Sequence, residues 1–200
     1  RRLSNGDDKP YELNISWWSA MEDSSRDSNR FQFERFILTQ LLVMALKGVP
    51  AFYLPALLAS ENDIKSFSMT GQRRDLNREK FKLDNLLSAL NNPESNANKN
   101  LKCLRNAMDV RSKLKQFHPC SEMKCLSKGR SDIVVIKRSD GPESVFAIHN
   151  MTENKINYQL KDDDLPKIID NNFNTQDFLT STKYNWKNIS LDPFQVIWLG

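Results

Sequence analysis

The longest apolar stretch in this 200-residue chain, FILTQLLVMALKGVPAFYLPALLA at 36–59, carries two different signals. Its first part continues a pattern in which apolar residues recur at helical spacing over 31–46, and Gly48 is well placed to end such a helix. Gln40, Lys47 and two prolines interrupt the stretch, so it falls short of the roughly 18 consecutive apolar residues of a membrane helix. The pattern predicts a helix over 31–46 and no membrane partner.

The second signal is VPAFYL at 49–54, a short apolar run that follows Gly48 and precedes Pro55. Its length, its flanking residues and its aromatic content predict a buried strand. A helix, a tight turn and a fully apolar strand form the αβ step of a parallel α/β fold. The stretch 56–78 is rich in Ser, Asn, Asp, Thr and Gly. It therefore predicts a long loop, of the kind in which α/β barrels place binding residues.

The residue pattern of the sequence changes at His118 and Pro119. Before them, two amphipathic helical stretches lie between 78 and 117, separated by NNPESNAN. After them, short β-rich segments alternate with turn signals, which predicts an antiparallel β domain. We therefore expect two domains, residues 1–118 and 119–200, the second a β-sandwich.

Charge and cysteine usage limit the partners that the chain can have. The net charge of +4 comes from 29 basic and 25 acidic residues that are scattered along the chain. A nucleic-acid binder concentrates basic residues on one stripe, so no nucleic-acid partner is expected. Cys103, Cys120 and Cys125 lack CxxC spacing and a histidine cluster, which predicts reduced structural thiols in a cytoplasmic protein. The chain begins with Arg1 in a polar stretch without a signal peptide, so we expect a piece of a longer protein.

Two groups of residues could bind a polar ligand. In KPYELN at 9–14, Glu12 could accept hydroxyl hydrogen bonds while Tyr11 stacks on a sugar ring, or both could be ordinary loop residues. In TGQRRDLNREKF at 70–81, the five donors of Arg74 suit vicinal hydroxyls, a carboxylate or a phosphate. Asp75 could orient Arg74, with Asn77 and Arg78 bracing the loop. The same residues also fit a capped helix start, with Asp75 or Asn77 as the N-cap.

Catalytic machinery is not evident from spacing alone. His118 and His149 have no serine or cysteine partner at nucleophile–base spacing, so both are interpreted as structural. The sequence contains no HExxH motif, no Walker motif and no phosphate-cradling glycine loop. We therefore expect neither a metal nor a cofactor. The four tryptophans are interpreted as residues of a core or a domain interface.

Three segments carry a resemblance to a known family. KPYELN at 9–14, RFILTQLLVMALKGVPAFYLPALLASEND at 35–63 and TGQRRDLNREKF at 70–81 occur in the order seen in sucrose phosphorylase-like enzymes. These enzymes form a branch of the α-amylase superfamily that includes glucosylglycerate phosphorylases. LDPFQVIWL at 191–199 resembles the end of their C-terminal β domain. The chain is thus similar to the C-terminal portion of such a glycoside phosphorylase.

The resemblance implies a fold class of α/β plus all-β: the C-terminal end of a (β/α)8 TIM barrel followed by a small antiparallel β domain. On that template, the helix at 31–47 is the seventh barrel helix and VPAFYL is the eighth strand. The loop at 56–78 then lies at the catalytic face of the barrel. Residues 79–117 form the last barrel helix with its elaboration.

The implied reaction is retaining transfer of a glucosyl unit from an α-glucoside to phosphate, giving α-glucose 1-phosphate. Such chemistry uses a pair of carboxylates, and the family carries them on barrel strands that precede the matched region. The resemblance therefore assigns no catalytic residue to this chain, which we expect to be inactive alone. It implies a small carbohydrate and phosphate as partners, with phosphate as co-substrate and no cofactor. It is also compatible with a homo-oligomer of the full-length protein.

The resemblance also implies roles for individual residues. Tyr11 and Glu12 match the loop that shapes the acceptor and phosphate side, and Arg74 matches an arginine that contacts the bound glucosyl unit. Sucrose-specific members tend to carry glutamine at the position of Glu12, which disfavours sucrose as the donor. Support of the loop is implied for Asp75, Asn77 and Arg78. Two alternatives remain: another hydrolase or transglucosylase of the superfamily, and a non-catalytic carbohydrate-binding remnant.

Overall fold

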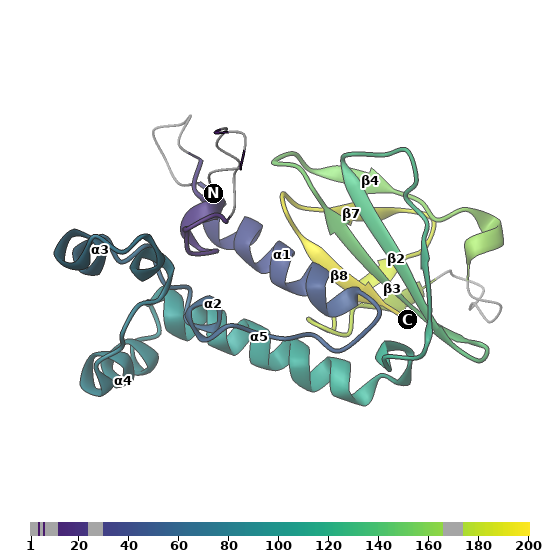
Figure 1. The fold of residues 1–200 in the computed structure, drawn as a ribbon. Helices are drawn as coiled ribbons and strands as arrows, with labels where there is room; N and C mark the ends of the chain where they lie inside the picture. The colour runs from purple at the N-terminus through teal and green to yellow at the C-terminus, as the bar shows by residue number, and fades with distance from the viewer. Residues whose placement is uncertain (1–3, 5, 7–11, 24–29, 166–173) are drawn as a thin grey trace.

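The computed structural model describes residues 4, 6, 12–23, 30–165 and 174–200. Figure 1 shows a layer of helices packed against one face of an antiparallel sheet, with two short helices projecting away from the sheet at one end. The helical elements are η1 (Ser19–Met21), α1 (Gln32–Ala45), α2 (Leu54–Leu57), α3 (Ile64–Thr70), η2 (Arg73–Asn77), α4 (Leu83–Asn91), α5 (Asn96–Lys113) and η3 (Lys115–Phe117).

Helix α1 confirms the helix predicted from apolar spacing, and its buried side includes Phe36, Leu41 and Met44. Helix α5 lies beside it (Figure 1). The side chain of Ser95 caps α5 by accepting a 3.1 Å hydrogen bond from the amide of Asn98. The predicted break between the two later helices is therefore narrower than the motif NNPESNAN, because α5 already begins inside it.

The prediction of a buried strand at 49–54 is wrong for this chain. Val49 is 81% exposed and Tyr53 is 56% exposed, and residues 49–53 pair with no strand in the described part of the chain. The backbone of Tyr53 is nevertheless extended, with φ −84° and ψ 134°, before α2 begins at Leu54. A parallel strand is stabilised by hydrogen bonds to neighbouring strands, and the described residues offer none here. The loop that follows also contains short helical turns.

The expected antiparallel β structure is present. The main sheet has the order β1-β2-β3-β8, and β4–β7 and β5–β6 form two separate two-stranded sheets; a short 3-10 turn, η4, follows β4. The bounds are β1 (Glu122–Cys125), β2 (Ile133–Asp140), β3 (Glu143–Asn150), β4 (Ile156–Tyr158), η4 (Asp162–Asp164), β5 (Asn174–Gln176), β6 (Lys183–Asn185), β7 (Ile189–Leu191) and β8 (Val196–Leu199). The exact extent of the two expected domains stays a prediction.

Alternation along the strands gives the main sheet two apolar faces. Ile136, Ala147 and Trp198 are successive cross-strand partners, and they pack with α1 and α5 residues in one buried cluster. On the other face, Ile148 pairs with Val135 and Ile197, in a cluster that includes residues of β7. The sheet is therefore buried on both sides, between the helices and the β4–β7 pair.

Two arginines join the helical layer to the sheet. Arg138 on β2 is fully buried and donates to the carbonyls of Ala45 and Leu46 at the end of α1, at 3.2 and 2.9 Å. Arg111 on α5 donates to the carbonyls of Met44 and Gly48, both at 3.0 Å. The last carbonyls of a helix have no partner within the helix, so these guanidinium groups satisfy them. Burial lowers the pKa of both arginines, and repulsion from Arg111 adds to the lowering of the pKa of Arg138.

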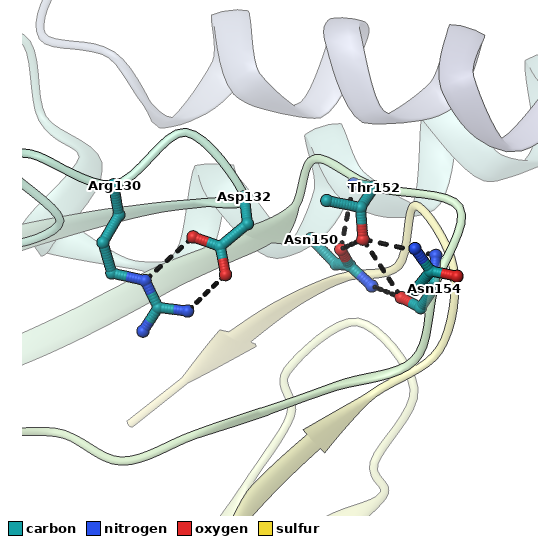
Figure 2. A network of polar contacts seen from close by, with 5 residues as sticks. All are labelled: Arg130, Asp132, Asn150, Thr152 and Asn154. Atoms are coloured by element: carbon teal, nitrogen blue, oxygen red, sulfur yellow. Dashed lines mark hydrogen bonds and ion pairs between the residues drawn. The ribbon is translucent and has the colours of Figure 1, made fainter.

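The end of β3 is fixed by a polar network around the buried side chain of Asn150 (Figure 2). Its Nδ2 atom donates to the carbonyls of Asn154 and Asp192, at 2.7 and 2.8 Å. Its Oδ1 atom accepts from the amide and the hydroxyl of Thr152, at 3.0 and 2.9 Å. All three side-chain hydrogen-bonding groups of Asn150 are used internally, so this residue is structural.

Other expectations can be compared with the structure. Trp18, Trp186 and Trp198 are buried as expected, whereas Trp17 is 42% exposed, so it is not a core residue and its place at a domain interface stays a prediction. The three cysteines are free thiols. Among the described residues, no helix is long and apolar enough to cross a membrane, and no cluster of His, Cys, Asp or Glu could hold a metal ion.

Candidate functional site

The loop that carries Arg74 is closed by local hydrogen bonds. Asp63 caps α3 by accepting from the amide and the hydroxyl of Ser66, at 2.8 and 2.5 Å, and these bonds lower the pKa of its carboxyl group. The amide of Asp63 donates to the carbonyl of Leu76 at 2.8 Å, which brings η2 back to the start of α3. Gly71 ends α3 with φ +67°, a left-handed conformation that glycine adopts without a steric penalty.

Asp75 stabilises the turn between α3 and η2. The hydroxyl of Thr70 donates to Oδ2 of Asp75 at 2.6 Å and accepts from the amide of Gln72 at 3.1 Å. Asp75 is thus engaged with the preceding helix. A different carboxylate, that of Glu12, contacts the guanidinium group of Arg74, and the expected role of Asp75 in orienting Arg74 stays a prediction.

A series of hydrogen bonds attaches the N-terminal segment to this loop. The amide of Ser16 donates to Oδ1 of Asn62 at 2.7 Å, and the amide of Asn62 donates to Oγ of Ser19 at 3.1 Å. The guanidinium group of Arg35 on α1 donates twice to the carbonyl of Met21, at 2.9 and 2.6 Å. The described residues from 12 to 23 are therefore held between α1 and the start of the loop.

This attachment brings two candidate site residues together. Nε of Arg74 lies 2.9 Å from Oε1 of Glu12, and Nη2 of Arg74 lies 3.1 Å from Oε2. The pair is bidentate, the geometry in which a guanidinium and a carboxylate fit each other best. The side chains of Arg74 and Glu12 are 52% and 38% exposed, so both remain accessible to a ligand. The hydrogen bond from Arg74 is the largest cause of the lowered pKa of Glu12, and the charge of Arg78 adds to it.

The remaining candidates have different surroundings. Tyr11 lies outside the described residues. Asn77 is half-buried, and its Oδ1 atom is buried without a hydrogen-bond partner in the described part of the chain. His149 is fully buried on the sheet, where burial lowers its pKa to about 4, and His118 is exposed. The structure thus brings Glu12, Arg74 and the charge of Arg78 to one place and leaves both histidines away from it.

One residue that helps to attach the N-terminal segment to the loop, Asn62, is not singled out by the sequence pattern. Asn62 lies between α2 and α3, and only the structure shows that its side chain reaches Ser16, 46 positions earlier. Asn62-Asp63 before a helical run is a recognisable start signal for α3, and the cap on Asp63 could have been predicted from it. The bridge of Asn62 to the N-terminal segment has no local signal.

The chain is similar in sequence to known enzymes. No protein-family model matches it. It is 30% identical over 144 residues to the glucosylglycerate phosphorylase of Spirochaeta thermophila, which covers 72% of this chain and 24% of that protein. It is 24% identical over 196 residues to the glucosylglycerate phosphorylase of Escherichia coli, which covers 98% of this chain and 33% of that protein. The resemblance to glycoside phosphorylases is confirmed. The chain spans about a quarter to a third of the length of these relatives.

Solved structures agree on the fold. A crystal structure of AmyP in complex with maltose has a TM-score of 0.68 at 14% identity, over 88% of this chain and 35% of that one. The trehalose-6-phosphate hydrolase of Bacillus licheniformis has a TM-score of 0.61 at 15% identity, over 86% of this chain and 39% of that one. Both are enzymes of the α-amylase family, so the arrangement of helices and β structure is of that type. The barrel end expected for 1–118 stays a prediction.

Proposed function

We propose that this chain is the C-terminal part of a retaining glycoside phosphorylase, which transfers a glucosyl unit from a glucosylglycerate- or sucrose-like α-glucoside to phosphate. The observation that carries the proposal is the bidentate pair of Arg74 and Glu12, which joins two motifs that resemble this enzyme branch. Relatives that are named glucosylglycerate phosphorylases support it.

In this proposal, Arg74 binds hydroxyl groups of the glucosyl unit, and Glu12 holds the guanidinium group in the required orientation. A guanidinium group presents a planar fork of donors, so a fixed orientation matters more for it than for a lysine. Tyr11 and Glu12 shape the side on which the acceptor and phosphate bind. The positive charge of Arg78 beside Glu12 favours a donor or acceptor that carries a carboxylate or a phosphate.

The proposal assigns the catalytic carboxylates to a part of the enzyme outside this chain. Exposed apolar side chains support a missing partner, because large contiguous apolar patches on a soluble protein mark surfaces that another element covers. The side chains of Val49, Tyr53 and Leu54, in the run that resembles the eighth barrel strand, are exposed. Those of Leu83 and Leu87 on α4 are exposed as well. We accordingly propose that 1–118 completes a barrel and that 119–200 is its β domain.

The test begins with the coding DNA upstream of residue 1. If it encodes the missing barrel, the longer protein is incubated with glucosylglycerate, with and without phosphate. The expected result is release of α-glucose 1-phosphate and glycerate only when phosphate is present, and no turnover by residues 1–200 alone. Release of free glucose at the same rate without phosphate would indicate a hydrolase instead. A stop codon directly before residue 1 would favour a non-catalytic carbohydrate-binding remnant.

A further inference from the structure

A cavity of about 560 Å³ lies at the C-terminal end of α5, where the chain passes from the helical layer to β1. Its lining includes the polar side chains of Arg111, Ser112, Lys115, His118, Ser121 and Asp140. The candidate loop with Arg74 lies elsewhere: α3 projects beyond the N-terminal end of α5 (Figure 1). A helix of 18 residues is roughly 27 Å long, so the two regions are well separated.

Three basic side chains line this cavity with donors to spare. Arg111 uses Nε and Nη2 to bind backbone carbonyls, whereas its Nη1 group makes no hydrogen bond to any described residue. Lys115 is exposed and forms no ion pair within the described part of the chain. The amide of Cys120 donates to Nδ1 of His118 at 3.2 Å. The neutral ring of His118 therefore carries its proton on Nε2, which makes that atom a donor.

The same cavity has acceptors at other positions. Ser112 and Ser121 use their hydroxyl protons on the carbonyls of Asp109 and Lys115, at 2.8 and 3.0 Å, so their oxygen lone pairs are left to accept. Asp140 adds a carboxylate from the end of β2. The lining thus combines cationic donors with acceptors suited to hydroxyl groups.

Positive charge exceeds negative charge around the cavity, because Arg111 and Lys115 line it together with a single carboxylate, that of Asp140. Arg138 is fully buried near Arg111, and repulsion between the two contributes to the lowered pKa of Arg138. Neither arginine forms an ion pair with a carboxylate among the described residues, since both bind backbone carbonyls. An anion in the cavity would gain charge-assisted hydrogen bonds from Arg111 and would reduce this repulsion.

We propose that the cavity binds a phosphate monoester of a hydroxylated small molecule, a sugar phosphate being the chemical type. The phosphate accepts hydrogen bonds from Nη1 of Arg111, from Lys115 and from Nε2 of His118. The hydroxyl groups of the same molecule donate to Asp140 and to the serine oxygens. Asp140 repels both phosphate groups alike, but it accepts hydrogen bonds from sugar hydroxyl groups that inorganic phosphate lacks, so it favours the ester over the free anion.

The test is a titration of the 200-residue chain, at a fixed concentration at which it is monomeric, with glucose 6-phosphate, inorganic phosphate and glucose, followed by amide shifts in NMR spectra. Glucose 6-phosphate is expected to saturate shifts that are confined to residues 111–121 and the neighbourhood of Asp140, and to bind more tightly than inorganic phosphate. Glucose alone is expected to leave these shifts unchanged. Inorganic phosphate binding as tightly as glucose 6-phosphate would overturn the proposal, as would shifts that lie elsewhere.

Three variants sharpen the test without touching the arginines that hold α1. Lys115→Gln is expected to weaken binding of both phosphates by about tenfold, the value of one charge-assisted contact. Lys113→Gln is the control: Lys113 lies two residues before Lys115, and its side chain does not line the cavity. Loss of its charge is expected to change the affinity for both phosphates less than twofold. Asp140→Ala removes the acceptor for sugar hydroxyl groups and is expected to abolish the preference for glucose 6-phosphate over inorganic phosphate. Equal effects of the two lysine variants would overturn the site.

Discussion

At the scale of single residues, the contact between Glu12 and Arg74 is the feature on which the proposed binding role rests. Both side chains are substantially exposed, and exposed ion pairs contribute little to stability, typically less than about 1 kcal/mol. Their bidentate geometry fixes the direction of the guanidinium fork in the free protein. The pair therefore contributes little to the stability of the fold, and its geometry fits the proposed role of orienting Arg74 for a ligand.

Replacement of Arg74 by lysine tests this explanation in the longer enzyme. We expect Arg74→Lys to lower kcat/KM for phosphorolysis by about 10- to 100-fold, because lysine cannot form two parallel hydrogen bonds. The free energy of unfolding of the 200-residue chain should change by less than about 1 kcal/mol. Arg73→Lys on the same turn is the matched control and should leave both quantities nearly unchanged. An equal loss of activity in the two variants would contradict a specific role for Arg74.

His149 predicts a pH dependence of stability. Burial lowers its pKa in the folded chain to about 4 from an ordinary value of 6.5. The unfolded chain therefore binds a proton more readily between these values, so stability is complete above pH 6.5 and falls as the pH drops towards 4. A shift of this size corresponds to about 3 kcal/mol. Urea unfolding from pH 4 to 7.5 should show this loss, and His149→Leu should remove that part of it. Parallel pH profiles of the two proteins would exclude His149 as the cause.

At the scale of secondary structure elements, the sequence correctly predicted the helices and strands that are determined by a local residue pattern. Helix α1 follows from apolar spacing, and the β structure after residue 119 follows from alternation and turn signals. The strand at 49–54 was wrong because a strand is stabilised by its neighbours, which the described chain does not provide. Glu12 and Arg74 were both predicted as binding residues, but their direct contact was not. It depends on a fold in which residues 62 positions apart meet.

Asn62 attaches the segment that contains Glu12 to the loop that contains Arg74. The effect of removing its side chain can be measured. We expect Asn62→Ala to release the N-terminal segment from the loop, because the amide of Ser16 loses its 2.7 Å acceptor. Amide hydrogen exchange at Ser16 should accelerate by about tenfold, which corresponds to the loss of one modest hydrogen bond. Asn92→Ala is a suitable control, since Oδ1 of Asn92 accepts only locally, from the amide of Glu94. Unchanged exchange at Ser16 would show that other contacts hold the segment.

At the scale of the whole molecule, the helical and β parts differ in how completely they are covered. The main sheet is packed on both faces, whereas the region around α2 and α4 exposes Val49, Tyr53, Leu54, Leu83 and Leu87. The curated relatives are about three times as long as this chain, a length in which further elements could cover that region. The uneven covering thus agrees with the proposed barrel.

Self-association of the isolated chain tests this view. We expect residues 1–200 to associate as concentration rises, because exposed apolar surface is the driving force. Replacing Val49, Tyr53 and Leu54 by serine should reduce the association, as measured by sedimentation velocity. Replacement of exposed Met123 on β1 provides a control outside this region. A monomer that stays monodisperse at high concentration would argue against a missing covering partner.

The buried Arg138 also has a consequence for the order of events during synthesis. Its hydrogen bond to Ala45 joins residues that are 93 positions apart, so the end of α1 leaves the ribosome long before the side chain that caps it. At a typical rate of 5 to 20 residues per second, that delay is on the order of 10 s. A nascent chain therefore carries an unfinished helix end throughout the production of α2 to α5. Translation speed over 46–138 becomes a variable that can decide how much of the protein reaches its final form.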